Sequence, residues 1–231
     1  MQPSSTFFVY LLGSIAILIG IYLLKISKNQ KFIYWWGLAL ILWGVGAIFA
    51  GTSYQAFSYE IKCAGRSFCL WTSWWEIIYL ILSVGSVNAM LMAQANLDKN
   101  GKWSRMIAVY APVNFLVYVI IVVIGALIPV QFLISFELML IFLGLTILFL
   151  LIFNVRRYLD QKKRINLSLV IIWISLILII GLYFIYFMLD ISNLLWEQGV
   201  WFSENDILHI GLILWMIYIG IVVSKLERNI K

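Results

Sequence analysis

Charged residues are scarce in this chain. Asp, Glu, Lys and Arg make up 11% of its 231 residues, whereas an average soluble domain contains about 25%. Hydrophobic residues make up 64% of the chain and raise the mean hydropathy to +1.02. This composition leaves no room for a soluble domain and predicts an integral membrane protein.

The sequence also lacks the pattern of a membrane β-barrel, in which apolar and polar residues alternate over segments of about 10 residues. Its apolar runs are unbroken, as in residues 117–124. A helix crosses the hydrocarbon with about 20 apolar residues, and seven windows meet this requirement. They cover roughly residues 6–25, 33–54, 73–95, 106–127, 131–155, 165–189 and 205–224. We therefore predict an all-α fold, in which residues 1–231 form one polytopic bundle of seven transmembrane helices.

The basic residues are distributed unevenly between the two sides of this predicted bundle. Fourteen of the 16 follow the first, third, fifth and seventh windows, and the remaining two, Lys62 and Arg66, follow the second. The fourteen are Lys25, Lys28, Lys31, Lys99, Lys102, Arg105, Arg156, Arg157, Lys162, Lys163, Arg164, Lys225, Arg228 and Lys231. Basic loops remain in the cytoplasm. We therefore predict a cell-membrane protein, in a plasma or bacterial inner membrane, with its N-terminus outside and its C-terminus in the cytoplasm.

The same distribution bears on partners. A basic cytoplasmic surface fits anionic lipid headgroups, and the sequence has no soluble module to hold a nucleic acid. We expect membrane lipids as partners, no nucleic acid, and a possible membrane-protein partner or second copy of the chain. Tryptophans prefer the headgroup level, and we expect most of them to anchor the helices there. The outer set is Trp71, Trp74, Trp75, Trp196 and Trp201, and the inner set is Trp35, Trp36 and Trp103.

Both cysteines, Cys63 and Cys69, fall in the predicted outer loop between the second and third windows. Disulfides persist in the oxidising compartment that such a loop faces. We predict a Cys63–Cys69 disulfide, with two free thiols as the alternative. A metal site is less favoured because no third soft ligand lies nearby in the sequence.

Histidine is nearly absent, and the single example, His209, lies near the outer end of the last window. Asp206 precedes it by three residues, so both side chains share one helix face. Ionisable groups in a membrane span indicate function by default. A carboxylate can orient an imidazole, which can then accept a proton, and a buried Glu76 could act as the acid. The candidate catalytic residues are His209, Asp206 and Glu76.

Each of these residues also has a structural alternative. Ser203 and Asp206 have the spacing of a capping box, and acidic residues favour a helix N-terminus. His209 could instead make an interhelical hydrogen bond, and Glu76 could simply be interfacial. No catalytic assignment follows from the sequence alone.

Five windows carry polar residues near the predicted outer surface. Within the fifth predicted window, Glu137 lies nearly two helical turns from the outer end. We expect these residues to form an outward-facing polar pocket. The predicted ligand-binding residues are Ser53, Gln55, Glu76, Tyr79, Glu137, Tyr183, Tyr186, Asp206 and His209. The inner half offers fewer polar residues, namely Ser86, Asn88 and Asn114. Interhelical hydrogen bonds are the default expectation for Asn88 and Asn114.

Three stretches of this layout resemble the CREST superfamily of seven-helix membrane proteins, which includes the alkaline ceramidases and the progestin and adiponectin receptors. They are residues 51–55, 73–76 and 205–209. In that family, the end of helix 2 and the starts of helices 3 and 7 build a zinc site. The family pattern has a histidine in helix 2 and two histidines, four residues apart, in helix 7. Here helix 2 has Ser53 and Gln55, and Ile213 follows His209 by four residues.

One histidine cannot build a three-histidine zinc site, so no metal site is predicted. The resemblance implies a membrane-embedded hydrolase of lipids or amphiphiles, or a receptor derived from one. The function we favour is that of a ligand-binding or sensing protein, or of an accessory subunit of a membrane complex. A membrane hydrolase is the first alternative. A small-solute or proton transporter is the second, less favoured because its path should be polar throughout. Whether the protein is an enzyme stays open, and the sequence identifies no cofactor.

Overall fold

The computed structural model describes residues 3–97, 102–128 and 130–229. Two of the basic residues noted above, Lys99 and Lys231, lie outside these ranges. All regular elements in the described ranges are helices. They are α1 (Pro3–Ser27), α2 (Lys31–Ala50), the π-helix η1 (Gly51–Ala56), α3 (Ser58–Lys62), α4 (Trp74–Ala95), α5 (Lys102–Leu127), the 3-10 helix η2 (Gln131–Ile134), α6 (Phe136–Gln161), α7 (Arg164–Met188), α8 (Ile191–Glu197) and α9 (Glu204–Asn229).

Seven of these segments are long and apolar enough to cross a membrane. They are α1, α2 with η1, α4, α5, α6, α7 and α9, which confirms the predicted seven-helix membrane architecture. The short elements η1, α3, η2 and α8 were not predicted, because each is too short to show a hydrophobic period. They lie in or beside the links between the long helices.

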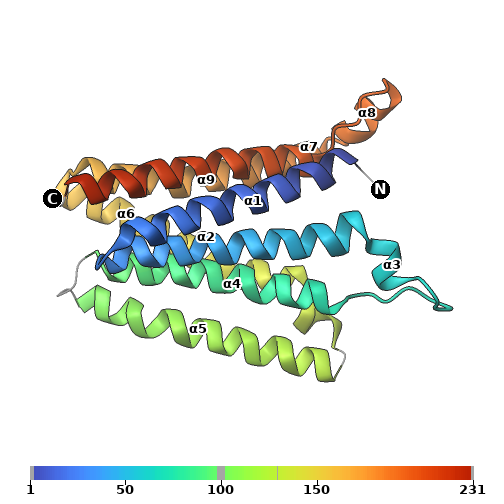
Figure 1. The fold of residues 1–231 in the computed structure, drawn as a ribbon, viewed down its shortest axis with the longest axis horizontal. Coiled ribbons are helices and arrows are strands. Elements are labelled where there is room, and N and C mark those ends of the chain that lie inside the picture. The colour runs from blue at the N-terminus through green and yellow to red at the C-terminus, as the bar shows by residue number, and fades with distance from the viewer. Residues whose placement is uncertain (1–2, 98–101, 129, 230–231) are drawn as a thin grey trace.

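The long helices run along the long axis of the molecule (Figure 1). Six of them close a ring, in which α1, α2, α4, α6, α7 and α9 each pack against their neighbours and α6 returns to α4. Helix α5 packs on α4 from outside this ring and lies at the edge of the bundle in Figure 1. We call the end that carries α3 and α8 the α3 end, and the opposite end, to which the fourteen basic residues belong in sequence, the basic end.

Close backbone contact joins α1 to α2. A Cβ atom added to Gly44 would lie 2.6 Å from the carbonyl oxygen of Gly13, and one added to Gly20 would lie 2.7 Å from that of Gly37. Small residues permit such an approach, which gains van der Waals contact where lipid offers no hydrophobic driving force. Helix α1 is thereby fixed against α2 along two turns.

Tryptophan rings fill the centre of the ring of helices. Trp36 stacks on Trp173 with 6.1 Å between ring centroids, Trp173 lies 6.4 Å from Trp215, and Trp43 lies 5.4 Å from Trp215. The expectation that Trp36 anchors the protein at the inner interface is wrong, because its side chain is 0% exposed. Its place on α2 faces the bundle core, where the contact with Trp173 replaces contact with headgroups.

Candidate functional site

Glu76 occupies a fixed position at the start of α4. Ser73, in an extended conformation, caps this helix, and its hydroxyl accepts a hydrogen bond from the Glu76 amide at 3.4 Å. Capping serines favour helix starts because they satisfy amides that have no partner within the helix. Glu76 therefore lies in the first turn, and the residue as a whole is buried, with 2% exposure. Glu76 thus lies at the start of the helix, with its side chain buried inside the protein.

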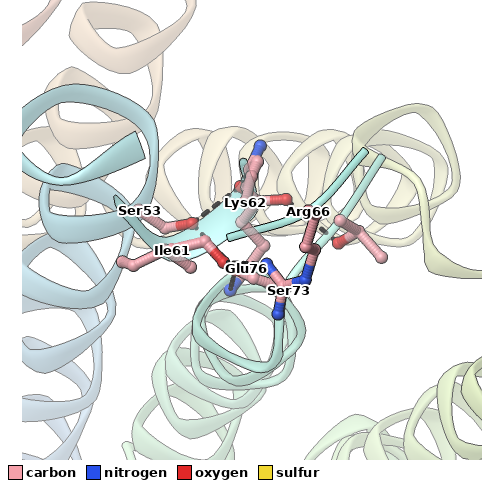
Figure 2. Close-up of polar contacts among 7 residues, drawn as sticks. Ser53, Ile61, Lys62, Arg66, Ser73 and Glu76 are labelled. Atoms are coloured by element: carbon pink, nitrogen blue, oxygen red, sulfur yellow. Dashed lines mark hydrogen bonds and ion pairs between the residues drawn. The ribbon is translucent and has the colours of Figure 1, made fainter. Parts of the chain in front are cut away.

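Groups from three other segments converge on this carboxylate (Figure 2). The hydroxyl of Ser53, from η1, donates to Oε1 at 2.7 Å, and that of Thr72 donates to Oε2 at 3.0 Å. Lys62, the last residue of α3, forms an ion pair with Oε1. The hydroxyls of Ser53 and Ser73 also lie 2.8 Å apart. The buried charge of Glu76 is thus neutralised by one cation and held by hydroxyl donors.

The Lys62 ammonium contacts an aromatic ring as well as the carboxylate. It lies 4.9 Å from the centroid of the Tyr54 ring, which meets the Tyr79 ring edge to face at 6.3 Å. A carboxylate combined with an aromatic face is a typical recognition site for a cation. Sequence reasoning included Tyr79 but missed Lys62 and Tyr54. The charge distribution could have indicated Lys62, because Lys62 and Arg66 are the two basic residues assigned to the predicted outer side.

A disulfide closes the loop that carries Lys62. Cys63 and Cys69 are bonded, as predicted. Within the loop, the Leu70 amide donates to the Lys62 carbonyl at 3.0 Å, and the Arg66 guanidinium donates to the Ile61 carbonyl at 2.8 Å. Helix α3 itself buries no residue. The position of Lys62 is therefore set by the disulfide loop and the contact with Glu76 more than by packing.

Asp206 forms a second polar cluster, between α1 and α9. Its carboxylate is fully buried and accepts from the hydroxyl of Ser4 at 3.0 Å and that of Ser5 at 2.8 Å. It also accepts from the Ser203 amide at 2.7 Å. The capping interaction between Ser203 and Asp206 is therefore confirmed, and the same carboxylate ties the start of α1 to the start of α9.

His209 is buried, with 9% exposure, one turn beyond Asp206. Its Nδ1 atom has no hydrogen-bond partner within the described residues. In that part of the chain no hydrogen bond joins Asp206 to His209, since the Asp206 donors are serine groups. The orientation of His209 by Asp206, on which the catalytic hypothesis rests, is absent from this arrangement.

Glu137 does not lie deep in its span, which corrects the expected depth. The apolar run at 131–134 forms η2, and Ser135 then caps α6 by accepting from the Leu138 amide at 3.2 Å. Glu137 is consequently in the first turn of α6, where acidic residues are favoured, and its side chain is exposed. Helix α6 therefore begins after the Ser135 cap and not at residue 131, where the apolar run begins.

The other predicted ligand-binding residues lie at the same end but make different contacts. Tyr186 is buried and donates to the Phe202 carbonyl at 3.3 Å, whereas Tyr183 is half-buried and stacks on Phe187. Gln55 is half-buried, and its Oε1 atom has no partner among the described residues. Among the described residues, none of these three side chains forms a hydrogen bond or ion pair with Glu76.

The two polar clusters are linked only indirectly. Within the described residues no hydrogen bond or ion pair runs from the Glu76 cluster to the Asp206 cluster. Helix α1 packs against both α2 and α9, and the hydroxyls of Tyr10 and Thr52 lie 2.7 Å apart across its contact with η1. Of the three stretches behind the CREST resemblance, 51–55 and 73–76 meet, while 205–209 belongs to the other cluster.

The basic half of the bundle is less apolar than we expected. Asn114 donates to Asn88 at 3.1 Å, which confirms the expected interhelical hydrogen bond. Gln94, Asn154 and Asn166 are also buried there. Both amide atoms of Gln94 and the side-chain oxygens of Asn154 and Asn166 have no partner among the described residues. Sequence reasoning missed these amides because single polar residues hardly change the hydropathy of a long apolar window.

Groups of three or more His, Cys, Asp or Glu residues close enough to hold a metal ion do not occur in the described ranges. The fold and the polar clusters define a multi-pass membrane protein with a buried carboxylate–ammonium site at one end of a seven-helix bundle. The chain belongs to a family of unknown function, DUF6962, whose model matches residues 5–228. No curated protein and no solved structure matches the chain.

Proposed function

We propose that this protein is a ligand-binding or sensing protein of the cell membrane, or an accessory subunit with that role, which recognises an amine at Glu76 from outside. The observation that carries the proposal is the ion pair between Lys62 and the buried Glu76. Burying a carboxylate is costly unless it is paired, so a site of this kind needs a cation. A ligand amine would supply the same charge as Lys62.

The orientation follows from the charge distribution. By their place in the sequence, fourteen of the 16 basic residues are assigned to the basic end, and the positive-inside rule places such an end in the cytoplasm. The α3 end then faces the outside, where an oxidising compartment suits the Cys63–Cys69 disulfide. The N-terminus is outside and the C-terminus inside under this proposal.

The charges at the α3 end favour a cationic ligand. Seven of the ten acidic residues belong to this end, against the two cations Lys62 and Arg66. The seven are Glu60, Glu76, Glu137, Asp190, Glu197, Glu204 and Asp206. An excess of one charge raises the local concentration of oppositely charged solutes. Amines are thus attracted to the mouth of the site, and anions are repelled.

Lys62 acts as an internal occupant of the amine site. Its ammonium contacts the carboxylate of Glu76 and the ring of Tyr54, which are the groups that would bind a ligand amine. Helix α3 buries no residue, whereas Glu76 is held in the capped first turn of α4. A ligand amine would therefore displace Lys62 and move α3 while the rest of the site stays in place. This displacement supplies the signal of a sensor.

The experiment compares three probes of equal chain length, hexylamine, hexanol and hexanoate, by saturation-transfer NMR on the protein in nanodiscs. We expect signal transfer to hexylamine above the level of the other two, and loss of this excess in Glu76→Gln. Glu197→Gln, which removes an exposed carboxylate of α8 at the same end, is the matched control and keeps this excess. Equal transfer to all three probes, or an unchanged excess in Glu76→Gln, would overturn the proposal.

A transporter is the second candidate, and one observation favours it. The basic half contains the buried, unpartnered amide atoms of Gln94 and the oxygens of Asn154 and Asn166. Such atoms are usually satisfied by water, and a hydrated half would extend a polar path inward from the α3 end. Hexylamine-dependent uptake into proteoliposomes tests this candidate, with Asn154→Leu as the variant that should slow it.

The membrane hydrolase implied by the CREST resemblance has less support. It would require His209, Asp206 and Glu76 to act together, and these residues belong to two clusters. The hydrogen bonds of Asp206 to Ser4, Ser5 and Ser203 favour a structural role for that residue. Binding is therefore the function that the geometry supports best.

A further inference from the structure

A cavity of about 530 Å³ opens at the basic end of the bundle, far from the Glu76 site. It lies between the first turn of α2, the end of α4 and the start of α5. Its lining residues are Lys31, Tyr34, Trp35, Met92, Ala95, Asn96, Ser104 and Ala108. The volume is within the range of sites for small ligands, about 300–1,000 Å³. None of its lining residues belongs to the Glu76 site.

Among the described residues that line the cavity, the charged side chain is that of Lys31. The eight lining residues include the ammonium of Lys31 and no carboxylate. Lys25, Lys28 and Lys31 are all exposed at the adjoining turn between α1 and α2. On the α5 side, the guanidinium of Arg156 lies 5.9 Å from the ring centroid of Trp103, next to Ser104 in sequence. Lys31 is therefore the cation that lines the cavity, and further basic residues lie on the adjoining parts of the chain.

The helix ends around the cavity add to this preference. Helix α2 begins at Lys31, and its N-cap residue Gln30 makes no side-chain capping bond. Its first amides therefore have no side-chain partner at the N-cap and favour an anion. The end of α4 is different, because the Ala95 carbonyl accepts a hydrogen bond from the Ser104 hydroxyl. The Ala95 carbonyl, which would repel an anion, is thereby satisfied by a donor.

The remaining lining is that of a lipid site. Tyr34 is exposed and Trp35 half-buried, and amphipathic rings of this kind lie at the headgroup level of a membrane. Met92, Ala95 and Ala108 provide apolar walls. A lysine combined with apolar walls and interfacial aromatic rings matches a lipid that carries a negative headgroup above its acyl chains.

We infer that this cavity binds an anionic phospholipid, with Lys31 and the start of α2 at the phosphate and the apolar walls at the first part of the acyl chains. The inference goes beyond the function proposed for Glu76 and does not depend on it. It also does not depend on which end of the bundle faces the cytoplasm, because a bilayer offers headgroups on both sides.

The test uses full-length protein in nanodiscs that contain equal amounts of phosphatidylglycerol and phosphatidylcholine with identical chains. Lipids that stay bound after gentle extraction are counted by native mass spectrometry. We expect retained phosphatidylglycerol to exceed phosphatidylcholine, and Lys31→Gln to reduce this excess about fivefold, the effect of one lysine near a lipid surface. The matched control is Lys163→Gln, which removes an exposed lysine at the same end outside the cavity and should leave the excess unchanged.

A second variant separates the cavity from general surface charge. Ala108→Trp fills the cavity without changing the charge, and it should also abolish the excess of phosphatidylglycerol. Thermal melting checks that each variant is folded, and Lys31 is exposed, so its substitution spares the core. Equal losses in Lys31→Gln and Lys163→Gln, or full retention in Ala108→Trp, would overturn the inference. Displacement of the lipid by inorganic phosphate, but not by chloride at equal ionic strength, would overturn the lipid as the occupant.

Discussion

The ammonium of Lys62 and the carboxylate of Glu76 form an ion pair in which the Lys62 side chain is 14% exposed and that of Glu76 is 3% exposed. The two residues belong to elements of very different character. Glu76 is fixed in a capped helix of 22 residues, whereas Lys62 ends a helix of five residues that buries nothing. The pair therefore joins a rigid anion to a cation that is held mainly by the disulfide loop.

Asp206→Ala should lower the stability of the protein. The serine groups that donate to Asp206 would lose their acceptor in a buried setting, at a cost of about 1–3 kcal/mol. Thermal melting in nanodiscs measures the change. Glu197→Ala is the matched control, because Glu197 is an exposed acidic residue in the helix α8 at the same end, and it should melt like the wild type. If both variants melt alike, Asp206 does not tie α1 to α9.

Much of the fold could be predicted because hydropathy is a local property. The seven spans and the Cys63–Cys69 disulfide follow from composition, spacing and side of the membrane. The partner of Glu76 could not be predicted in the same way, because Lys62 reaches it through a five-residue helix that has no period. The depth of Glu137 was wrong because Ser135 starts α6 later than the apolar run suggests. The burial of Trp36 depends on its contact with Trp173, which is distant in sequence.

Gly44→Ala should destabilise the bundle, since its new Cβ atom would lie 2.6 Å from the Gly13 carbonyl oxygen and force α1 away from α2. Gly144→Ala offers a control on a transmembrane helix, because nothing lies within 4 Å of the position of its Cβ atom. Alanine is favoured over glycine within helices by about 1 kcal/mol, so this control should melt at or above the wild-type temperature. A Gly44→Ala protein that melts like Gly144→Ala would show that the close contact is dispensable.

The disulfide should stabilise the α3 end. Loss of a bridge that closes so short a loop costs about 2 kcal/mol, so the double variant Cys63→Ser with Cys69→Ser should open this region more readily. Hydrogen exchange at the backbone of α3 would report faster exchange, with no change in α9. Non-reducing mass mapping of the native protein gives the companion check, because two free thiols there would contradict the bond.

The proposed orientation can be tested with a membrane-impermeant maleimide on intact cells. A cysteine introduced as Asp190→Cys lies at the α3 end, and one introduced as Lys163→Cys lies at the basic end, both at exposed positions. The first should be labelled in intact cells and the second only after the cells are opened, on a background in which Cys63 and Cys69 are replaced by serine. The reverse pattern would place the N-terminus in the cytoplasm.

The amine site is tested most directly by replacing its internal occupant. Lys62→Met removes the cation from Glu76, and breaking a buried pair costs about 3–5 kcal/mol, so the variant should melt several degrees lower. Hexylamine should restore the melting temperature of Lys62→Met, whereas hexanol at the same concentration should not. The double variant Lys62→Met with Glu76→Gln has no carboxylate that could pair with an amine, so neither probe should change its melting temperature. A melting temperature of Lys62→Met that hexylamine leaves unchanged would contradict amine recognition at Glu76.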